Sequence, residues 1–193
     1  MSGSAAWDKR HARRGRRSDP ADFVISAARW FPRDARVLDV AGGTGRNAVW
    51  LAGQGFEVTL IDFSPVALRL ASESAEAAGL LLDTVVWDVA ALGLPPGPVQ
   101  GRWDVIVVHH FLDRPSLDAV PAHLAPGGVL AFCQPTERNL ERNPRPAARW
   151  LLADGELTDW ANRHDDALEV IDAGEGWFDG RYEARLVASR VPT

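Results

Sequence analysis

Short apolar runs alternate with amphipathic segments along most of the chain. Runs rich in β-branched residues predict strands at 36–41, 56–61, 84–87, 104–108 and 129–132. Apolar residues at helical spacing predict helices at 20–31, 47–52 and 65–78. Because predicted strands and helices alternate, the pattern is typical of a doubly wound α/β fold whose strands are mostly parallel.

The C-terminal part predicts two further strands and a short helix. The strands are expected at 168–171 and 183–189, and the helix at 155–161. Gly174, Gly176 and Gly180 predict a loop between these strands, which are close enough in sequence to pair antiparallel. The expected architecture is a seven-stranded, mostly parallel sheet with an antiparallel C-terminal strand and helices on both faces.

The composition describes one globular domain. Of the 193 residues, 46% are hydrophobic, and no apolar run approaches the roughly 20 residues that a membrane span needs. The N-terminus lacks the apolar core of a secretory signal, and Cys133, the single cysteine, has no partner for an intramolecular disulfide. We therefore expect a cytoplasmic protein. The histidines are scattered along the chain, so no metal site is expected.

Charge divides the chain into two parts. Residues 1–17 carry a net charge of +5, from six basic residues against one acid, which leaves −10 on residues 18–193. A basic arm could contact nucleic acid, but the acidic remainder would repel phosphates. We therefore expect residues 1–17 to form a lid over a substrate site, and residues 18–193 to form the single domain behind it.

A glycine turn at residues 42–45 joins a predicted strand to a predicted helix. Glycine lets a backbone approach a ligand closely, and the run also fits a dinucleotide fingerprint, with Asp62 ending the second strand. An NAD-dependent oxidoreductase is thus one interpretation. Asp39, inside the first strand, argues against it, because a carboxylate repels a pyrophosphate but attracts a ligand ammonium. Asp88, at the end of the third strand, could accept a hydrogen bond from an adenine amino group.

The segment Leu38–Gly45, with acids at three successive strand ends, resembles the glycine motif of the class I S-adenosylmethionine-dependent methyltransferases. Three further segments are similar to the tellurite-resistance methyltransferase group: Trp7–Arg10, Gly45–Ala48 and Leu151–Leu157. The resemblance implies a Rossmann-like fold and S-adenosyl-L-methionine as cofactor, with S-adenosyl-L-homocysteine as product. It also implies in-line methyl transfer to a small-molecule acceptor.

The resemblance implies a cofactor site at the ends of the first three strands. Asp39 and the backbone of residues 43–45 would hold the methionine part, and Asp62 would hold the ribose. Asp88 and Val89 would contact the adenine. The full set of expected cofactor contacts is Asp39, Ala41, Gly42, Gly43, Gly45, Asn47, Asp62, Phe63, Asp88, Val89 and His109.

The acceptor side is expected next to His109 and His110, which follow the fourth predicted strand. Either could act as a general base, because imidazole titrates near neutrality, or could merely cap a helix or lie on the surface. Both are therefore candidate catalytic residues. The expected substrate contacts are Trp7, His11, Arg14, Arg46, Arg114 and Trp177.

Two interpretations from other classes stay open at this point. One is the NAD-dependent oxidoreductase, and the other is a non-catalytic module that binds a cofactor or nucleic acid. The expected partner is a small-molecule methyl acceptor, with no membrane partner, and the charge pattern disfavours nucleic acid. The sequence does not decide which acceptor is used, or whether the protein is a monomer or a homodimer.

Overall fold

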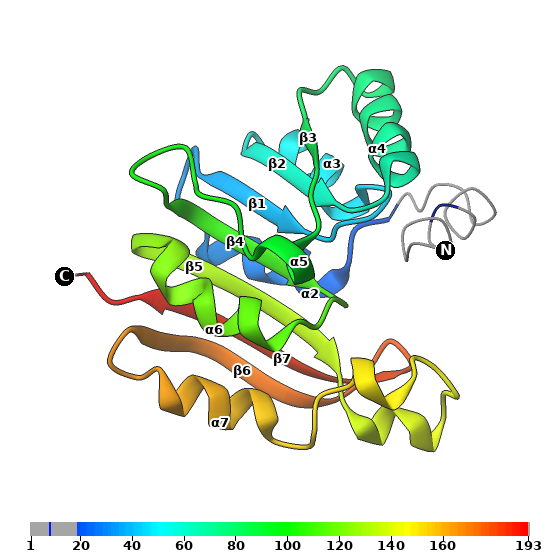
Figure 1. The fold of residues 1–193 in the computed structure, drawn as a ribbon, viewed down its shortest axis with the longest axis vertical. Coiled ribbons are helices and arrows are strands. Elements are labelled where there is room, and N and C mark those ends of the chain that lie inside the picture. The colour runs from blue at the N-terminus through cyan, green and yellow to red at the C-terminus, as the bar shows by residue number, and fades with distance from the viewer. Residues whose placement is uncertain (1–7, 9–18, 193) are drawn as a thin grey trace.

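The computed structural model describes Asp8 and residues 19–192. They form one seven-stranded sheet in the order β3-β2-β1-β4-β5-β7-β6 (Figure 1). The strands are β1 (Arg36–Val40), β2 (Glu57–Asp62), β3 (Asp83–Val86), β4 (Trp103–His109), β5 (Leu124–Pro135), β6 (Leu168–Phe178) and β7 (Arg181–Arg190). Strand β7 runs antiparallel to both of its neighbours, and the other paired strands are parallel. The expected sheet is confirmed.

Helices cover both faces of this sheet, as the sequence predicts (Figure 1). Those on one face are α2 (Asp22–Ala27), continued by η1 (Ala28–Trp30), α3 (Arg46–Gly53) and α4 (Pro65–Ala77). Those on the other face are α5 (Val89–Leu92), α6 (Arg114–His123) and α7 (Glu156–Arg163). Two short 3₁₀ turns, η2 (Glu137–Glu141) and η3 (Ala148–Trp150), follow β5.

Two hydrophobic cores result, one on each side of the sheet. Alternate residues of a strand point to opposite faces, so Val105 and Val107 pack under α2 and α3 while Ile106 and Val108 pack under α6. Central strands buried on both faces read as continuous apolar runs, which explains why β4 was evident in the sequence.

Two expectations about the C-terminal half are wrong or incomplete. The loop expected from Gly174 is strand instead, because β6 continues to Phe178 and its glycines pair with β7. An edge strand bonds on one side only, so it tolerates glycine there. Helix α6 was not expected, although Asp113 caps it through the Ser116 amide at 3.0 Å. Pro121 inside this helix weakens its sequence pattern.

The carboxyl end of the sheet is where the fold leaves room for chemistry. The strand order reverses between β1 and β4, and open α/β sheets bind ligands at such a switch point. The glycine turn follows β1, and His109 ends β4. None of the helices in the described part of the chain is long and apolar enough to cross a membrane.

A matched pair of glycine variants tests how tightly the glycine turn is packed. Gly45 and Gly127 both have positive φ, but a Cβ on Gly45 would lie 2.6 Å from Ala71 Cβ, whereas one on Gly127 would have nothing within 4 Å. We expect Gly127→Ala to lower the free energy of unfolding by about 1–2 kcal/mol through backbone strain. Gly45→Ala should cost about 1–3 kcal/mol more, through overpacking.

Urea denaturation of both variants and of Ala71→Gly measures this difference. Ala71→Gly alone should cost about 1 kcal/mol, as glycine does inside a helix, and should cost less when Gly45→Ala is already present. Equal costs at the two glycine positions, without this coupling, would show that α4 does not fix the turn.

Candidate functional site

The glycine turn places its backbone over the end of β1. Ala41, Gly43 and Gly45 all adopt positive φ, at 52°, 61° and 79°. A Cβ on Gly42 would overlap the Asp39 carboxylate, so only glycine fits there. Ala41 is not a glycine, and a positive φ at such a residue is a strained conformation that clusters at functional sites. The turn therefore leaves an open backbone surface at the sheet edge.

Asp39 lies beneath this turn and is fully buried. Neither carboxylate oxygen has a hydrogen-bond partner of ordinary geometry in the described part of the chain, although the Ala48 amide and the charge of Arg46 favour its ionised form. Burial, and then the nearby charge of Asp62, raises the pKa of Asp39 to about 7. A buried acid without partners is costly, and a cationic ligand group would remove that cost. The residues present thus fit a cofactor that carries an ammonium.

Asp62 ties the end of β2 to the glycine turn. Its Oδ2 accepts from the Gly43 amide at 3.0 Å, and its Oδ1 accepts from the Ser64 amide at 2.8 Å. Each carboxylate oxygen can accept a second hydrogen bond, so these contacts are compatible with binding ribose hydroxyls. Phe63, half-buried, follows directly.

Asp88 and Asn47 have structural contacts of their own. Asp88 is exposed and caps α5 by accepting from the Ala91 amide at 3.3 Å, while Val89 beside it is buried. The buried Asn47 accepts from the Ala21 amide at 2.9 Å and so joins the start of α2 to α3. Both residues lie where the sequence places them, but these contacts alone explain their presence.

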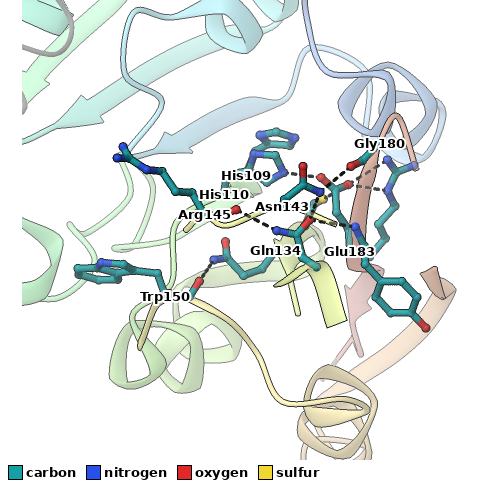
Figure 2. A network of polar contacts seen from close by, with 12 residues as sticks. His109, His110, Gln134, Asn143, Arg145, Trp150, Gly180 and Glu183 are labelled. Carbon is teal, nitrogen blue, oxygen red and sulfur yellow. Dashed lines mark hydrogen bonds and ion pairs between the residues drawn. The ribbon is translucent and has the colours of Figure 1, made fainter. Parts of the chain in front are cut away.

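Three adjacent strands bring a polar cluster together on the α2/α3 side of the sheet. His109 on β4 is in register with Cys133 on β5, which is in register with Arg185 on β7. The ring of His110 stacks on that of His109 with centroids 3.9 Å apart. His110 Nε2 lies 2.7 Å from Glu183 Oε1 (Figure 2). The two expected catalytic residues therefore belong to one network.

Cationic side chains surround this cluster. Arg46 Nη2, from the first turn of α3, lies 3.4 Å from His109 Nδ1. Burial is the main cause that holds the pKa of His109 well below its ordinary value, and His110, Arg46, Arg185 and Arg181 lower it further. Arg46, which directly follows the glycine turn, thus contacts His109.

The donor atoms of His109, His110 and Cys133 all lie within 4.8 Å of one another. Residues so far apart in the chain give no metal motif in the sequence. The arginines around them oppose a divalent cation, because like charges at such short range repel strongly in a buried site. We therefore assign no metal ion to this cluster.

Glu183 and Arg185 are the site residues that the sequence analysis missed. They are two positions apart on β7, so they lie on the same face of a strand whose other residues are mostly buried. Two charged residues at this spacing in an otherwise mostly apolar strand are the signal that could have revealed them. Arg185 contacts Glu183 through Nη2 at 3.1 Å, and its guanidinium stacks over Phe178 at 3.8 Å.

The remaining expected substrate contacts lie in different places. Trp177 on β6 packs edge-to-face on Tyr182, with the Arg142 guanidinium 4.0 Å from its ring centroid. Arg114 forms a two-point ion pair with Glu156, at 2.5 and 2.8 Å, and so joins α6 to α7. Trp7, His11 and Arg14 lie outside the described residues. Asp8 is described, and it accepts a hydrogen bond from the Ser64 hydroxyl.

Comparisons with known proteins point to a methyltransferase domain. Residues 37–128 match the family model described as a methyltransferase domain. A tRNA 5-carboxymethoxyuridine methyltransferase of Escherichia coli strain K12 is 32% identical over 111 residues, which are 52% of this chain and 40% of that protein. The chain spans between 33% and 55% of the length of the curated relatives that it matches.

Solved structures share the fold over most of the chain. The crystal structure of TehB from Haemophilus influenzae has a TM-score of 0.69 at 20% identity, covering 97% of this chain and 67% of that one. A magnesium protoporphyrin IX methyltransferase from Synechocystis, with S-adenosylhomocysteine bound, has a TM-score of 0.68 at 15% identity, covering 97% and 94%. Residues 37–128 thus match a methyltransferase domain, and the chain shares its fold with S-adenosylmethionine-dependent methyltransferases, which favours S-adenosylmethionine over NAD as the cofactor of this site.

Proposed function

We propose that the protein transfers the methyl group of S-adenosylmethionine to a small-molecule acceptor, which binds at the carboxyl ends of β4, β5 and β7. The observation that carries this proposal is the buried, unpartnered carboxylate of Asp39 on one side of the switch point, with the histidine network on the other. A cofactor held by Asp39 would direct its methyl group toward the histidine network.

The residues of this chain have distinct roles in that reaction. The bound cofactor supplies a methyl group already activated on a sulfonium. Asp39 pairs with the cofactor ammonium, Asp62 binds the ribose, and Asp88 binds the adenine. Transfer then requires mainly alignment of the acceptor and exclusion of water, so these positioning contacts account for most of the catalysis.

The expected lid, residues 1–17, lies outside the described residues apart from Asp8. Asp8 supports a role for this segment at the site, because it accepts a hydrogen bond from the Ser64 hydroxyl, and Ser64 directly follows Asp62 and Phe63. The basic character of the segment suits an acceptor that is or becomes anionic.

RNA is the second candidate acceptor, favoured by two observations. The relative from Escherichia coli K12 is a tRNA methyltransferase. Arginines also stack on aromatic rings near the acceptor side: Arg138 on Tyr182, Arg142 on Trp177 and Arg185 on Phe178. These arginines and rings are already paired with each other, and residues 18–193 carry −10, which disfavours a polyanion.

An acceptor panel tests the choice between these two. Formation of S-adenosylhomocysteine would be measured with small thiols, phenols, carboxylic acids, selenite and tellurite, and with bulk tRNA purified from cells that lack this protein. We expect turnover of a small molecule and none of tRNA. Turnover confined to tRNA would reject the small-molecule assignment.

Asp39→Asn should separate cofactor binding from stability. Because burial raises the pKa of Asp39 from an ordinary value of 3.8 to about 7, the folded protein binds more protons than the unfolded chain between these values, and stability falls as pH rises through them. The variant should therefore be more stable than the wild type at pH 8 and similar at pH 4. Its affinity for S-adenosylmethionine should fall by about 10- to 100-fold.

Calorimetric titration and thermal unfolding at the two pH values measure these effects. Asp166→Asn, at an exposed position, is the matched control and should change neither quantity. Unchanged cofactor affinity in Asp39→Asn would remove this residue from the cofactor site.

Deletion of residues 1–17 tests the lid. We expect turnover to fall sharply and the Michaelis constant of the acceptor to rise, because water reaches the methyl group, while circular dichroism stays unchanged. The assay uses the acceptor found in the panel. A truncated protein with full activity would show that the segment is not a lid.

A further inference from the structure

We propose that His110, oriented by Glu183, is the general base that removes a proton from the acceptor, and that the acceptor is a thiol or a phenol. This inference rests on the proposed function, since it names the substrate class of the same site. His110 is the catalytic residue, because it would touch the acceptor. Glu183 acts through it and is a positioning residue.

Glu183 is held as an anion at the centre of the network (Figure 2). Its side chain is 5% exposed, and its two oxygens receive different partners. Oε1 faces His110 at 2.7 Å, while Oε2 accepts from Cys133 Sγ at 3.2 Å and from Arg185 Nη2 at 3.1 Å. Burial opposes ionisation, but the contacts with His110, Cys133 and Arg185 outweigh it and hold the pKa of Glu183 below its ordinary value.

An ionised carboxylate can only accept, so it fixes the tautomer of His110. The proton of the neutral ring lies on Nε2, and Nδ1 carries the lone pair. Among the described residues, Nδ1 has no hydrogen-bond partner. Nδ1 is therefore the atom available to accept a proton.

The backbone and the neighbouring ring hold His110 in one orientation. Its φ is +60°, and its amide donates to the Cys133 carbonyl at 2.9 Å. The ring stacks against His109, and its side chain is 25% exposed, so it is accessible from the sheet edge. A strained backbone that orients one imidazole toward a ligand-binding edge is what a positioned base requires.

Burial keeps this imidazole neutral. The groups around it are Glu183 and Arg181 on β7, His109 on β4, Cys133 on β5 and Arg46 on α3, and Arg185 reaches it through Glu183. Burial is the largest cause of a lowered pKa for His110, opposed by Glu183 and reinforced by Arg181 and Arg46. Because the pKa of His110 lies below the ordinary value of 6.5, its ring is unprotonated at neutral pH and can act as a base.

A base among guanidiniums selects the acceptor class. An ammonium would be repelled by Arg46, Arg181 and Arg185, and a carboxylate is already ionised and needs no base. A thiol or a phenol arrives neutral and becomes an anion, which the same arginines stabilise. Its ordinary pKa of about 8.5 to 10 is also low enough for a neutral imidazole to deprotonate it.

The reaction balances without a further reagent. The acceptor proton moves to His110 Nδ1, and the sulfur or oxygen lone pair forms a bond to the methyl carbon. The bond between that carbon and the sulfonium sulfur breaks, and its electron pair stays on sulfur, which gives neutral S-adenosylhomocysteine. His110 then releases the proton to water.

Two thiol probes test the role of His110 directly. Benzyl mercaptan is a neutral thiol at pH 7, whereas 4-nitrothiophenol is already ionised. We expect His110→Asn, in which asparagine tolerates the left-handed backbone, to lower kcat on benzyl mercaptan by at least about 100-fold. The loss on 4-nitrothiophenol should be less than about 5-fold, and S-adenosylhomocysteine affinity should not change. His123→Asn is the matched control.

Glu183→Gln supplies a second readout through the pH profile. Glu183 raises the pKa of His110, so the variant should shift the acidic limb of kcat/KM on benzyl mercaptan to lower pH and lower the plateau. The Michaelis constant should change less than kcat. Glu169→Gln, at an exposed position on β6, should keep the wild-type profile.

Each other outcome overturns a specific statement. Equal losses on both thiols would show that His110 does not act as a base. If the wild type binds S-adenosylhomocysteine but methylates neither these thiols nor any phenol in the panel, the acceptor class is wrong and the cofactor assignment stands. If the wild type does not bind S-adenosylhomocysteine at all, the proposed function itself fails.

Discussion

The buried carboxylate of Asp39 is the constraint around which the cofactor edge is built. Strand β1 has β2 on one side and β4 on the other, with helices over both faces, so water does not reach this acid. The glycine turn covers it, and Gly42 has no side chain because the carboxylate occupies that space. Asp62 adds a second negative charge nearby. The cost of this arrangement is relieved by a cation, which is what the methionine ammonium provides.

The acceptor side depends on a different feature, the antiparallel insertion of β7. Because β7 runs antiparallel to β5, its first residues lie at the carboxyl ends of the parallel strands. Glu183 and Arg185 thereby meet His110 and Cys133, which lie 50 or more positions earlier in the chain. Contacts of this kind come from topology, and local sequence patterns carry no record of them.

The parts of the fold predicted from the sequence are those set by local patterns. The central strands β1, β2, β4 and β5 were evident because they are apolar runs, and the glycine turn was evident because few other residues fit it. Helix α6 was missed because Pro121 interrupts its pattern, and the end of β6 was missed because Gly174 and Gly176 resemble a loop. In both places, tertiary packing outweighs local propensity. Asp39, His109 and His110 were found because they lie at or next to the ends of predicted strands, whereas Glu183 belongs to no local motif.

Charge is distributed unevenly across the switch point, and this distribution suits the proposed reaction. Asp39 and Asp62 lie at the ends of β1 and β2, while Arg181 and Arg185 lie on β7, with Arg46 between the two groups. Arg46 lowers the pKa of Asp39 and of His109, so it acts on both halves.

A cationic donor and an acceptor that becomes anionic would therefore each face the opposite charge. Methyl transfer converts these two ions into two neutral products, so the attraction that holds the reactants is lost once the bond has moved. Because charge is dispersed in the transition state, this field does not lower the barrier by itself. This charge distribution positions the reactants and binds the neutral products more weakly. The rate then depends on the alignment that the strained backbone at Ala41 and His110 maintains.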